Sequence, residues 1–354
     1  MKTTILLGLQ YGSESKGMVA SSLAKAGGYD AAITVNSCQA GHTSYAMGLD
    51  GPVKIVNRQL PSAFPYVDKV IIGAGAMIKP HVLKEEIEFI EKNGWKDIRK
   101  KLYIDKHAGI VPDDAGEHEK ELVKEIGSTG EGVGWALQER IMRRAPVVKD
   151  DPFFKDYGEI CDTWKLYHAI DTAILEGCQG FGLSLYYGYY PKTTSRDTGV
   201  LALASGAGIP PASIDQVVGV ARTYPIRVGT VVKSSGYMFE EVDWETVTKE
   251  SGSPEPLVEK TTVTGRVRRV ARWDDALIEK AVYMNSVDKI ALTFINYVNW
   301  GDAEVDNWHD LSEKSKDFIH HNVARHCKVG WVSGNPYGMF PVTLSDLAEA
   351  QGSA

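Results

Sequence analysis

The sequence predicts an α/β fold in which helices flank a central, mainly parallel β-sheet. Short apolar runs alternate along the chain with stretches of helical spacing, and several of these runs end in turns that contain glycine. Apolar residues make up 43% of the 354 residues and charged residues 24%, which are ordinary values for a globular protein. A chain of this length can hold two average domains or one large α/β domain.

The first strand, turn and helix are expected between residues 5 and 26. Ile5 to Gly17 reads ILLGLQYGSESKG, and the apolar periodicity of a helix runs from Met18 to Ala26. The turn would place backbone N–H groups, hydroxyls and a lysine at a helix N-terminus, where a phosphate group binds favourably. It departs from the Walker pattern because a serine precedes that lysine. Many α/β proteins carry such a turn without a ligand, so both interpretations stay open.

The following segments continue the alternation. Residues 31–36 form an expected buried strand, which is followed by the turn QAGHT with His42. This histidine either reaches into a cleft or lies on the surface as a cap. Residues 69–78 predict a further strand ending in glycines, and residues 81–95 predict a helix.

Two glycine-bearing segments in the middle of the chain are candidate ligand sites. GSTGEGVG at residues 127–134 precedes an expected helix at 135–144 and could cradle a phosphate. The arginines late in that helix can simply complement its dipole. LEGCQG contains Gln179, whose amide at the end of a strand can both donate to and accept from a nucleobase.

Two stretches in the second half are rich in arginine. Residues 216–220 predict a strand that feeds a basic turn at 222–227, and TTVTGRVRRVAR spans residues 261–272. The planar fork of arginine suits a carboxylate or a phosphate. For the stretch at residues 261–272, a solvated basic face is the alternative.

Charge, cysteine spacing and hydropathy limit the class of protein. The net charge of −7 argues against a general nucleic-acid binder. The four cysteines are far apart and form no C-x-x-C pair, which indicates neither a disulfide framework nor a zinc knuckle. No signal peptide or membrane-spanning run is visible, so we expect a cytoplasmic protein without membrane association.

A histidine-rich stretch near the end of the chain is a weaker candidate for a metal site. It contains His320, His321, His326 and Cys327. No carboxylate or second ligand pair accompanies them, so a helix surface leading into the last strand is the better interpretation.

Taken together, the motifs resemble those of adenylosuccinate synthetases. GLQYGSESKG, QAGHT, GSTGEGVG, LEGCQG, YYPKTTS, TTVTGRVRR and IALTFIN occur in the order and at the rough spacing of that family. The resemblance implies one large domain over residues 1–354, with a P-loop-related fold, that works as a homodimer. It also implies a ligase that moves the γ-phosphoryl of a nucleoside triphosphate to the purine 6-oxygen, after which the amine of L-aspartate displaces that phosphate.

The resemblance implies a role for each matching residue. The residues implied in the chemistry are Ser13, Lys16, His42 and Gln179. Those implied to hold the acceptor nucleotide are Ser13, Gln39, Ser128, Thr129, Gln179, Thr194 and Arg143 of the partner subunit. Those implied to hold ATP are Gly12, Ser15, Lys16, Gly17, Gly41, His42, Thr43, Asn296, Gly334 and Pro336. Aspartate would meet Thr264, Arg266 and Arg268, and Mg²⁺ would meet Ser13 and Gly41.

The acceptor site departs from the family pattern at two positions. Where the family has an aspartate that acts as the general base, this chain has Ser13, and a hydroxyl is a poor base at neutral pH. The exchange leaves room and removes charge beside purine position 2, so an exocyclic 2-amino group could fit there. Gln39 replaces an asparagine and leaves a phosphate contact possible with altered geometry.

The donor site also departs from the pattern. In the family's T-K-x-D element the aspartate accepts from the guanine edge of GTP, whereas this chain has Phe294 and Asn296 in place of the lysine and the aspartate. An asparagine amide can donate to the ring nitrogen of adenine and accept from its amino group. Donor specificity should therefore shift towards ATP or dATP, since a mispaired buried edge costs about 1–3 kcal/mol.

These substitutions resemble the phage-type branch of the family, which acts in the synthesis of 2-aminoadenine for modified DNA. They imply that dGMP is the acceptor and that the product is a succino-2-amino-deoxyadenylate, made in the host cytoplasm if the chain is phage-encoded. A conventional synthetase acting on IMP is the first alternative. An inactive nucleotide-binding homologue is the second.

Overall fold

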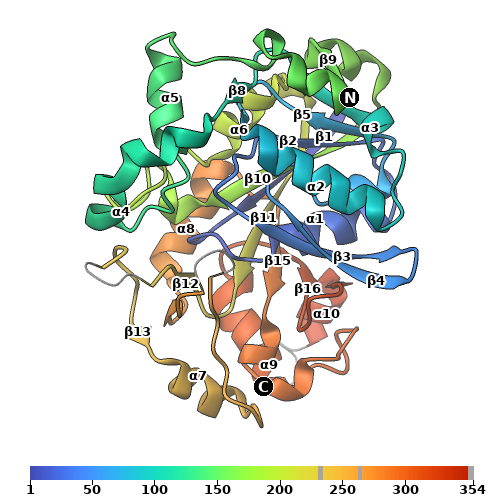
Figure 1. Ribbon diagram of the computed structural model, residues 1–354. Coiled ribbons are helices and arrows are strands. Elements are labelled where there is room, and N and C mark those ends of the chain that lie inside the picture. The colour runs from blue at the N-terminus through green and yellow to red at the C-terminus, as the bar shows by residue number, and fades with distance from the viewer. Residues whose placement is uncertain (230–233, 262–264, 350–354) are drawn as a thin grey trace.

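A mainly parallel sheet forms the centre of the molecule (Figure 1). The computed structural model describes residues 1–229, 234–261 and 265–349, so the predicted aspartate contact Thr264 lies outside the described residues. Within them the sheet has ten strands in the order β17-β16-β15-β11-β1-β10-β2-β5-β7-β9. Every neighbouring pair is parallel except β16 and β17.

The strands of this sheet are spread over almost the whole chain. Their bounds are β1 Lys2–Gly8, β2 Ala31–Thr34, β5 Lys69–Ile72, β7 Leu102–Asp105, β9 Glu159–Cys161, β10 Thr172–Gly180, β11 Ile214–Arg222, β15 Lys289–Thr293, β16 Val329–Val332 and β17 Phe340–Pro341. The first strand pairs with β10 on one side and β11 on the other, so the turn that follows it lies at the middle of the sheet edge.

Helices cover both faces of the sheet. Their bounds are α1 Lys16–Lys25, α2 Pro80–Lys92, α3 Ile98–Lys101, α4 Lys120–Ile126, α5 Val133–Ile141, α6 Val200–Ala207, α7 Trp244–Ser251, α8 Asp275–Asn285, α9 Glu313–Phe318 and α10 Leu344–Glu349. Alternate residues of β1 enter opposite cores: Leu6 joins a cluster with α1 and α2, and Leu7 joins one with α6 and α8. This period of two is the pattern of a strand buried on both faces.

Smaller sheets flank the central one. The hairpin of β3 His42–Gly48 and β4 Gly51–Asn57 packs against α1. The short strands β6 Met77–Ile78 and β8 Gly109–Ile110 pair in parallel. An antiparallel sheet joins β12 Ile226–Arg227, β14 Arg269–Ala271 and β13 Glu241–Val242.

The predicted fold class is confirmed, while several predicted bounds move. The strand predicted at residues 69–78 is split into β5 and β6 by a turn at residues 73–76. The turn passes against the end of α6, where a Cβ at Gly75 would lie 2.7 Å from the Cα of Gly206. The helix predicted at 135–144 ends at Ile141, because Arg143 takes a left-handed φ of 60°.

Within the described ranges, no helix combines the length and apolarity that a bilayer crossing requires.

Candidate active site

The turn after β1 holds a carboxylate of its own. Gly12, Ser13 and Ser15 all have left-handed φ values, of 84°, 58° and 64°. The fully buried Glu14 accepts hydrogen bonds from the backbone N–H groups of Gln10 at 3.2 Å and Gly12 at 2.7 Å.

Lys16 completes this arrangement, with its Nζ 2.8 Å from the Glu14 carboxylate. Both side chains are buried, at 3% and 0% exposure. Glu14 thus accepts from three donors, which hold its carboxylate in place. The carboxylate of Glu14 therefore fixes the position of Lys16, the predicted phosphate contact, at the turn.

Gln179 lies directly against this turn. It is the penultimate residue of β10 and has a left-handed φ of 59°. Its Cα is 3.5 Å from the position that a Cβ on Gly12 would take. Its amide Oε1 is buried without a hydrogen-bond partner in the described structure. A buried acceptor left unpaired costs about 1–3 kcal/mol, so this oxygen is suited to a donor on a ligand.

His42 begins β3 and is fixed by a glutamate that the sequence interpretation had given no role. Its Nδ1 lies 2.5 Å from Oε1 of Glu176, a β10 residue, and both side chains are buried. The second oxygen of Glu176 accepts from the backbone N–H of Ser62 at 2.6 Å. Since Glu176 occupies Nδ1, the imidazole can offer Nε2 to a ligand.

The start of α1 packs on the same strand. A Cβ on Gly17 would lie 2.9 Å from the carbonyl oxygen of Thr43 and 3.1 Å from the carbonyl carbon of His42. Only glycine allows this close approach. The structure thus brings Lys16, Gly17, His42 and Thr43 together.

The segment before β3 contains further unpaired polar atoms. Gln39 has a buried Oε1 without a partner among the described residues, while Gly41 is exposed. Asn57, which is opposite His42 in the hairpin, is 1% exposed and has neither amide atom paired within that part of the chain. Buried polar atoms normally have hydrogen-bond partners, so a polar ligand bound here would supply the ones that these atoms lack.

The glycine-rich turn between α4 and α5 is tied to this segment. Glu131 in the turn pairs with Arg58 at 3.2 Å and Lys79 at 3.5 Å, and Arg58 Nε donates to the Cys38 carbonyl at 2.7 Å. These contacts place Ser128 and Thr129 on a turn anchored next to Gln39.

The loop that carries Thr194 approaches the same region. A Cβ on Gly134 would lie 3.1 Å from the hydroxyl of Ser195, the next residue in the chain. The backbone N–H of Thr194 donates to Leu183 at 2.8 Å. The predicted contacts of the 5′-phosphate therefore come from neighbouring segments.

Arg143 is the exception, since it lies just beyond the far end of α5. Its side chain is exposed and Nη1 donates to the Ile141 carbonyl at 2.7 Å. Figure 1 shows α4 and α5 (green) at one edge of the molecule. Within one chain, no contact joins Arg143 to the predicted site residues that the structure describes.

The predicted donor-base residues lie at the carboxyl ends of adjacent strands. Ile295, after β15, donates from its N–H to the carbonyl of Ser333, after β16, at 3.1 Å. This contact brings Asn296 near Gly334 and the exposed Pro336. Asn296 is 8% exposed and its Oδ1 has no partner among the described residues.

The hairpin closes this region from the other side. The ring of Tyr45 on β3 meets that of Tyr337 edge to face, with centroids 4.9 Å apart. The loop after β16 therefore faces the strand that carries His42.

Arg268 reaches the turn after β1. Its Nη1 donates to the Ser13 hydroxyl at 2.8 Å, and burial lowers the pKa of its guanidinium. Arg266 is exposed. The other arginines of the stretch, Arg269 and Arg272, pair with Glu241 and Glu250, so the stretch is not one anion site.

The turn predicted at residues 222–227 is shorter than expected: it spans residues 223–225, and the two arginines at its ends lie in strands. Arg222 ends β11 and is fully buried. Arg227 forms part of β12, and burial lowers its pKa to about 10. Both arginines therefore belong to the interior rather than to a solvated surface.

The terminal histidines also have separate partners. His321 Nδ1 lies 2.9 Å from the carbonyl of Asp317, whereas His326 Nε2 lies 2.7 Å from a carboxylate oxygen of Asp275. Among the described residues, no group of three or more histidines, cysteines or carboxylates is placed to hold a metal.

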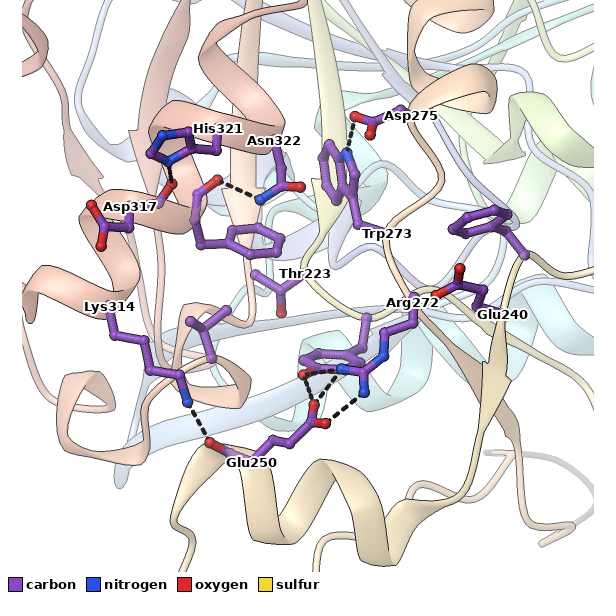
Figure 2. Close-up of a pocket in the computed structure, with 14 residues that line it drawn as sticks. Thr223, Glu240, Glu250, Arg272, Trp273, Asp275, Lys314, Asp317, His321 and Asn322 are labelled. Carbon is purple, nitrogen blue, oxygen red and sulfur yellow. Dashed lines mark hydrogen bonds and ion pairs between the residues drawn. The ribbon is translucent and has the colours of Figure 1, made fainter.

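A cavity of about 640 Å³ lies elsewhere, and it is lined by none of the residues implied to hold the acceptor, ATP or aspartate (Figure 2). Glu250 pairs there with Arg272 and accepts from the Tyr224 hydroxyl at 2.6 Å. Lys314 donates to the Glu250 carbonyl at 2.5 Å. Because these polar groups satisfy one another, the unpaired donors and acceptors around Gln179, Asn57 and Asn296 identify the better candidate for a polar substrate.

Comparison with solved structures agrees with the fold. The chain resembles a succinoaminodeoxyadenylate synthetase of cyanophage S-2L, solved bound to dGMP and dATP as an energy donor, with a TM-score of 0.81 and 25% identity over 99% of this chain and 98% of that one. It also resembles a fully ligated adenylosuccinate synthetase from Plasmodium falciparum, with a TM-score of 0.79 and 20% identity over 97% and 100% of the two chains.

Sequence relatives point to the same family. The chain is 36% identical to the adenylosuccinate synthetase of Methanococcus vannielii and 34% identical to that of Archaeoglobus fulgidus, each over 90% of this chain and 91% of the relative. The family model described as adenylosuccinate synthetase matches residues 5–157 and 152–301. The chain therefore belongs to the adenylosuccinate synthetase family, whose members are ligases that join aspartate to a purine nucleotide at the expense of a nucleoside triphosphate.

Proposed function

We propose that this ligase joins L-aspartate to carbon 6 of dGMP, with ATP or dATP as the phosphoryl donor, and so makes a succino-2-amino-deoxyadenylate. The observation that carries the proposal is Ser13, a neutral residue in the turn after β1. Its hydroxyl accepts from Arg268, and Gly12 of the same turn lies against Gln179. The solved phage relative, which binds dGMP and dATP, supports it.

The acceptor base fits this proposal through Ser13. A serine is smaller than the aspartate of the family pattern and carries no charge, which leaves room for the 2-amino group of guanine. Its hydroxyl already accepts from Arg268 and keeps a second lone pair for that amino group. Gln179, with its unpaired Oε1, would meet the purine on the side of the chemistry.

The donor base fits through Asn296. Its unpaired Oδ1 can accept from the 6-amino group of adenine, and its Nδ2 can donate to an adenine ring nitrogen. The same oxygen would face the 6-oxygen of guanine without a proton between them, which disfavours GTP.

The reaction would proceed in two displacements. The purine 6-oxygen attacks the γ-phosphorus while ring nitrogen 1 loses its proton to water, and ADP or dADP leaves. The aspartate amine then attacks carbon 6, and phosphate leaves while the amine gives up one proton to it. Lys16 and His42 would neutralise the phosphates, with Glu176 holding the imidazole so that Nε2 faces them. Arg268 and Arg266 would hold the two carboxylates of aspartate.

A bound Mg²⁺ fits the oxygen donors available, and it would neutralise charge on the transferred phosphoryl group. Ser13 Oγ and the Gly41 carbonyl are hard oxygen ligands, and the remaining ligands would come from phosphate and water. Ser13 would have to exchange its contact with Arg268 for the cation.

We further propose that the chain acts as one domain and as a homodimer. Strands from Lys2 to Pro341 in a single sheet support the first point. For the second, Arg143 is exposed beside Ile141 and Met142, which are 69% and 53% exposed, so an apolar patch adjoins the arginine predicted to act in trans. We propose no nucleic-acid or membrane partner.

Incubation with ATP, Mg²⁺, aspartate and either dGMP or IMP tests the function. Aspartate-dependent phosphate release with dGMP is expected. Turnover of IMP alone would support the conventional activity, which the names of the archaeal relatives favour. Absence of turnover with both acceptors would indicate an inactive nucleotide-binding homologue.

A further inference from the structure

Arg222 is joined to the turn after β1 through its backbone. Its N–H donates to the side-chain oxygen of Gln10 at 3.0 Å, and its carbonyl accepts from the Gln10 amide nitrogen at 3.0 Å. The side chain is 0% exposed, so it cannot reach a substrate directly.

The guanidinium meets three segments at once. Nη1 donates to the Ser13 carbonyl at 3.0 Å, and both terminal nitrogens contact the carboxylate of Glu259. The group also lies over the ring of Phe294, 3.8 Å from its centroid. Arginine is suited to this arrangement because one planar group can pair bidentately and stack on an aromatic ring.

Glu259 is joined to Arg268 through its backbone. Its carbonyl accepts from the Arg268 N–H at 2.8 Å, and its carboxylate accepts from the Tyr297 hydroxyl at 3.0 Å. Burial raises the pKa of Glu259, but the charge and hydrogen bonds of Arg222 outweigh burial and hold the pKa below its ordinary value. The two residues thus form an ion pair in which the arginine is fully buried and the glutamate is 22% exposed.

We infer that Arg222 is a positioning residue that holds three substrate subsites in register: Ser13 at the acceptor base, Glu259 with Arg268 at aspartate, and the Phe294–Asn296 element at the donor base. The inference rests on the proposed assignment of these subsites, but it does not depend on which purine is the acceptor. Removing Arg222 would take the cationic partner from the partly buried carboxylate of Glu259, and it would also remove the guanidinium contacts to the Ser13 carbonyl and the Phe294 ring. The three segments would then no longer share a common contact.

The chain offers a matched control. Arg272, Glu250 and Tyr224 form a second Arg–Glu–Tyr group, with a bidentate ion pair and a tyrosine hydroxyl on the same carboxylate. Arg272 also approaches its tyrosine ring, at 6.0 Å from the centroid. This group lines the cavity of Figure 2 and contacts none of the predicted substrate residues.

The test compares Arg222→Gln, Arg222→Lys and Arg272→Gln by steady-state kinetics with each substrate varied in turn. The acceptor is whichever of dGMP and IMP the wild type turns over. For Arg222→Gln we expect KM to rise about tenfold or more for both ATP and aspartate, since each site loses a charge-assisted contact. Arg222→Lys, which keeps the charge, should recover part of the loss. Arg272→Gln should lower the Tm while leaving both KM values within about twofold of wild type.

Two results would overturn the inference: unchanged KM values in a folded Arg222→Gln, or equal KM increases in Arg272→Gln. If Arg222→Gln does not fold, Glu259→Gln replaces it, with the same KM increases expected and unchanged values counting against the inference. If the wild type turns over neither acceptor, the proposed function fails and the same variants are compared by equilibrium titration with ATP. A wild-type ATP affinity in the Arg222 or Glu259 variant would then still overturn the inference.

Discussion

Arg268 and Ser13, which are far apart in the sequence, meet through a 2.8 Å hydrogen bond from the guanidinium Nη1 to the serine hydroxyl. The contact joins a residue assigned to aspartate with one assigned to the acceptor purine. A change at Ser13 should therefore affect two substrates.

Ser13→Asp is expected to lower kcat/KM for dGMP about tenfold or more. The carboxylate would crowd purine position 2 and would pair with Arg268, which would also raise KM for aspartate. Steady-state phosphate release with dGMP and with IMP measures both effects. Ser13→Ala, which keeps the space but removes the hydroxyl, should lose less dGMP turnover than Ser13→Asp. An unchanged or faster dGMP rate in Ser13→Asp would count against this account.

Asn296→Asp is expected to shift the donor preference from ATP towards GTP. A carboxylate can accept from the guanine edge but cannot donate to adenine, and such a mismatch costs about 1–3 kcal/mol, or roughly 5- to 150-fold in kcat/KM. The ratio of kcat/KM values for ATP and GTP is the measurement. If that ratio is the same in the variant and the wild type, Asn296 does not contact the donor base.

Glu176→Gln is expected to lower kcat about 100-fold with little change in KM. The amide is similar in size to the carboxylate but cannot stabilise a positive charge on His42, from which it is separated by 2.5 Å. In a His42→Ala background the same change should cost little more, because the two residues act as a unit. Additive losses would show that Glu176 acts independently of the histidine.

Glu86 should make stability depend on pH. Burial raises the pKa of its carboxyl from 4.5 to about 7, against two backbone N–H groups that favour the anion. A folded-state pKa above the unfolded value means that the native state binds the extra proton. The stabilisation is thus complete below about pH 4.5 and is lost as the pH rises through about 7.

The Glu86→Gln variant should remove this dependence. Its stability relative to wild type is expected to increase from pH 5 to pH 8, by about 3 kcal/mol at most. Urea unfolding at the two pH values measures the change. Glu88→Gln, an exposed change on the same helix, should show no such trend. A constant difference between Glu86→Gln and wild type would mean that Glu86 is ionised in the folded protein throughout this range.

The sequence predicted the class of fold, and it singled out several segments that the structure brings together, because periodicity and glycine-rich turns are local features. It did not predict long-range pairings such as Glu176 with His42 or Arg222 with Glu259, since neither partner has a local signal for the other. The supposed basic turn at 222–227 shows the same limit. Whether an arginine is solvated or buried depends on the strand order, which only the folded chain reveals.

The role proposed for Arg143 in the partner's site can be tested by mixing two inactive variants. Lys16→Ala removes a residue of the triphosphate side, and Arg143→Ala removes the exposed residue beyond α5. In a symmetric dimer that shares sites, a hybrid of the two holds one site with both residues intact and one site with neither. After random exchange of subunits, half the dimers are hybrids, so activity should recover to about a quarter of wild type. Recovery should depend on protein concentration during mixing. If the mixture remains as inactive as the separate variants although size-exclusion chromatography shows exchanged dimers, Arg143 serves its own chain and the proposed sharing of sites is wrong.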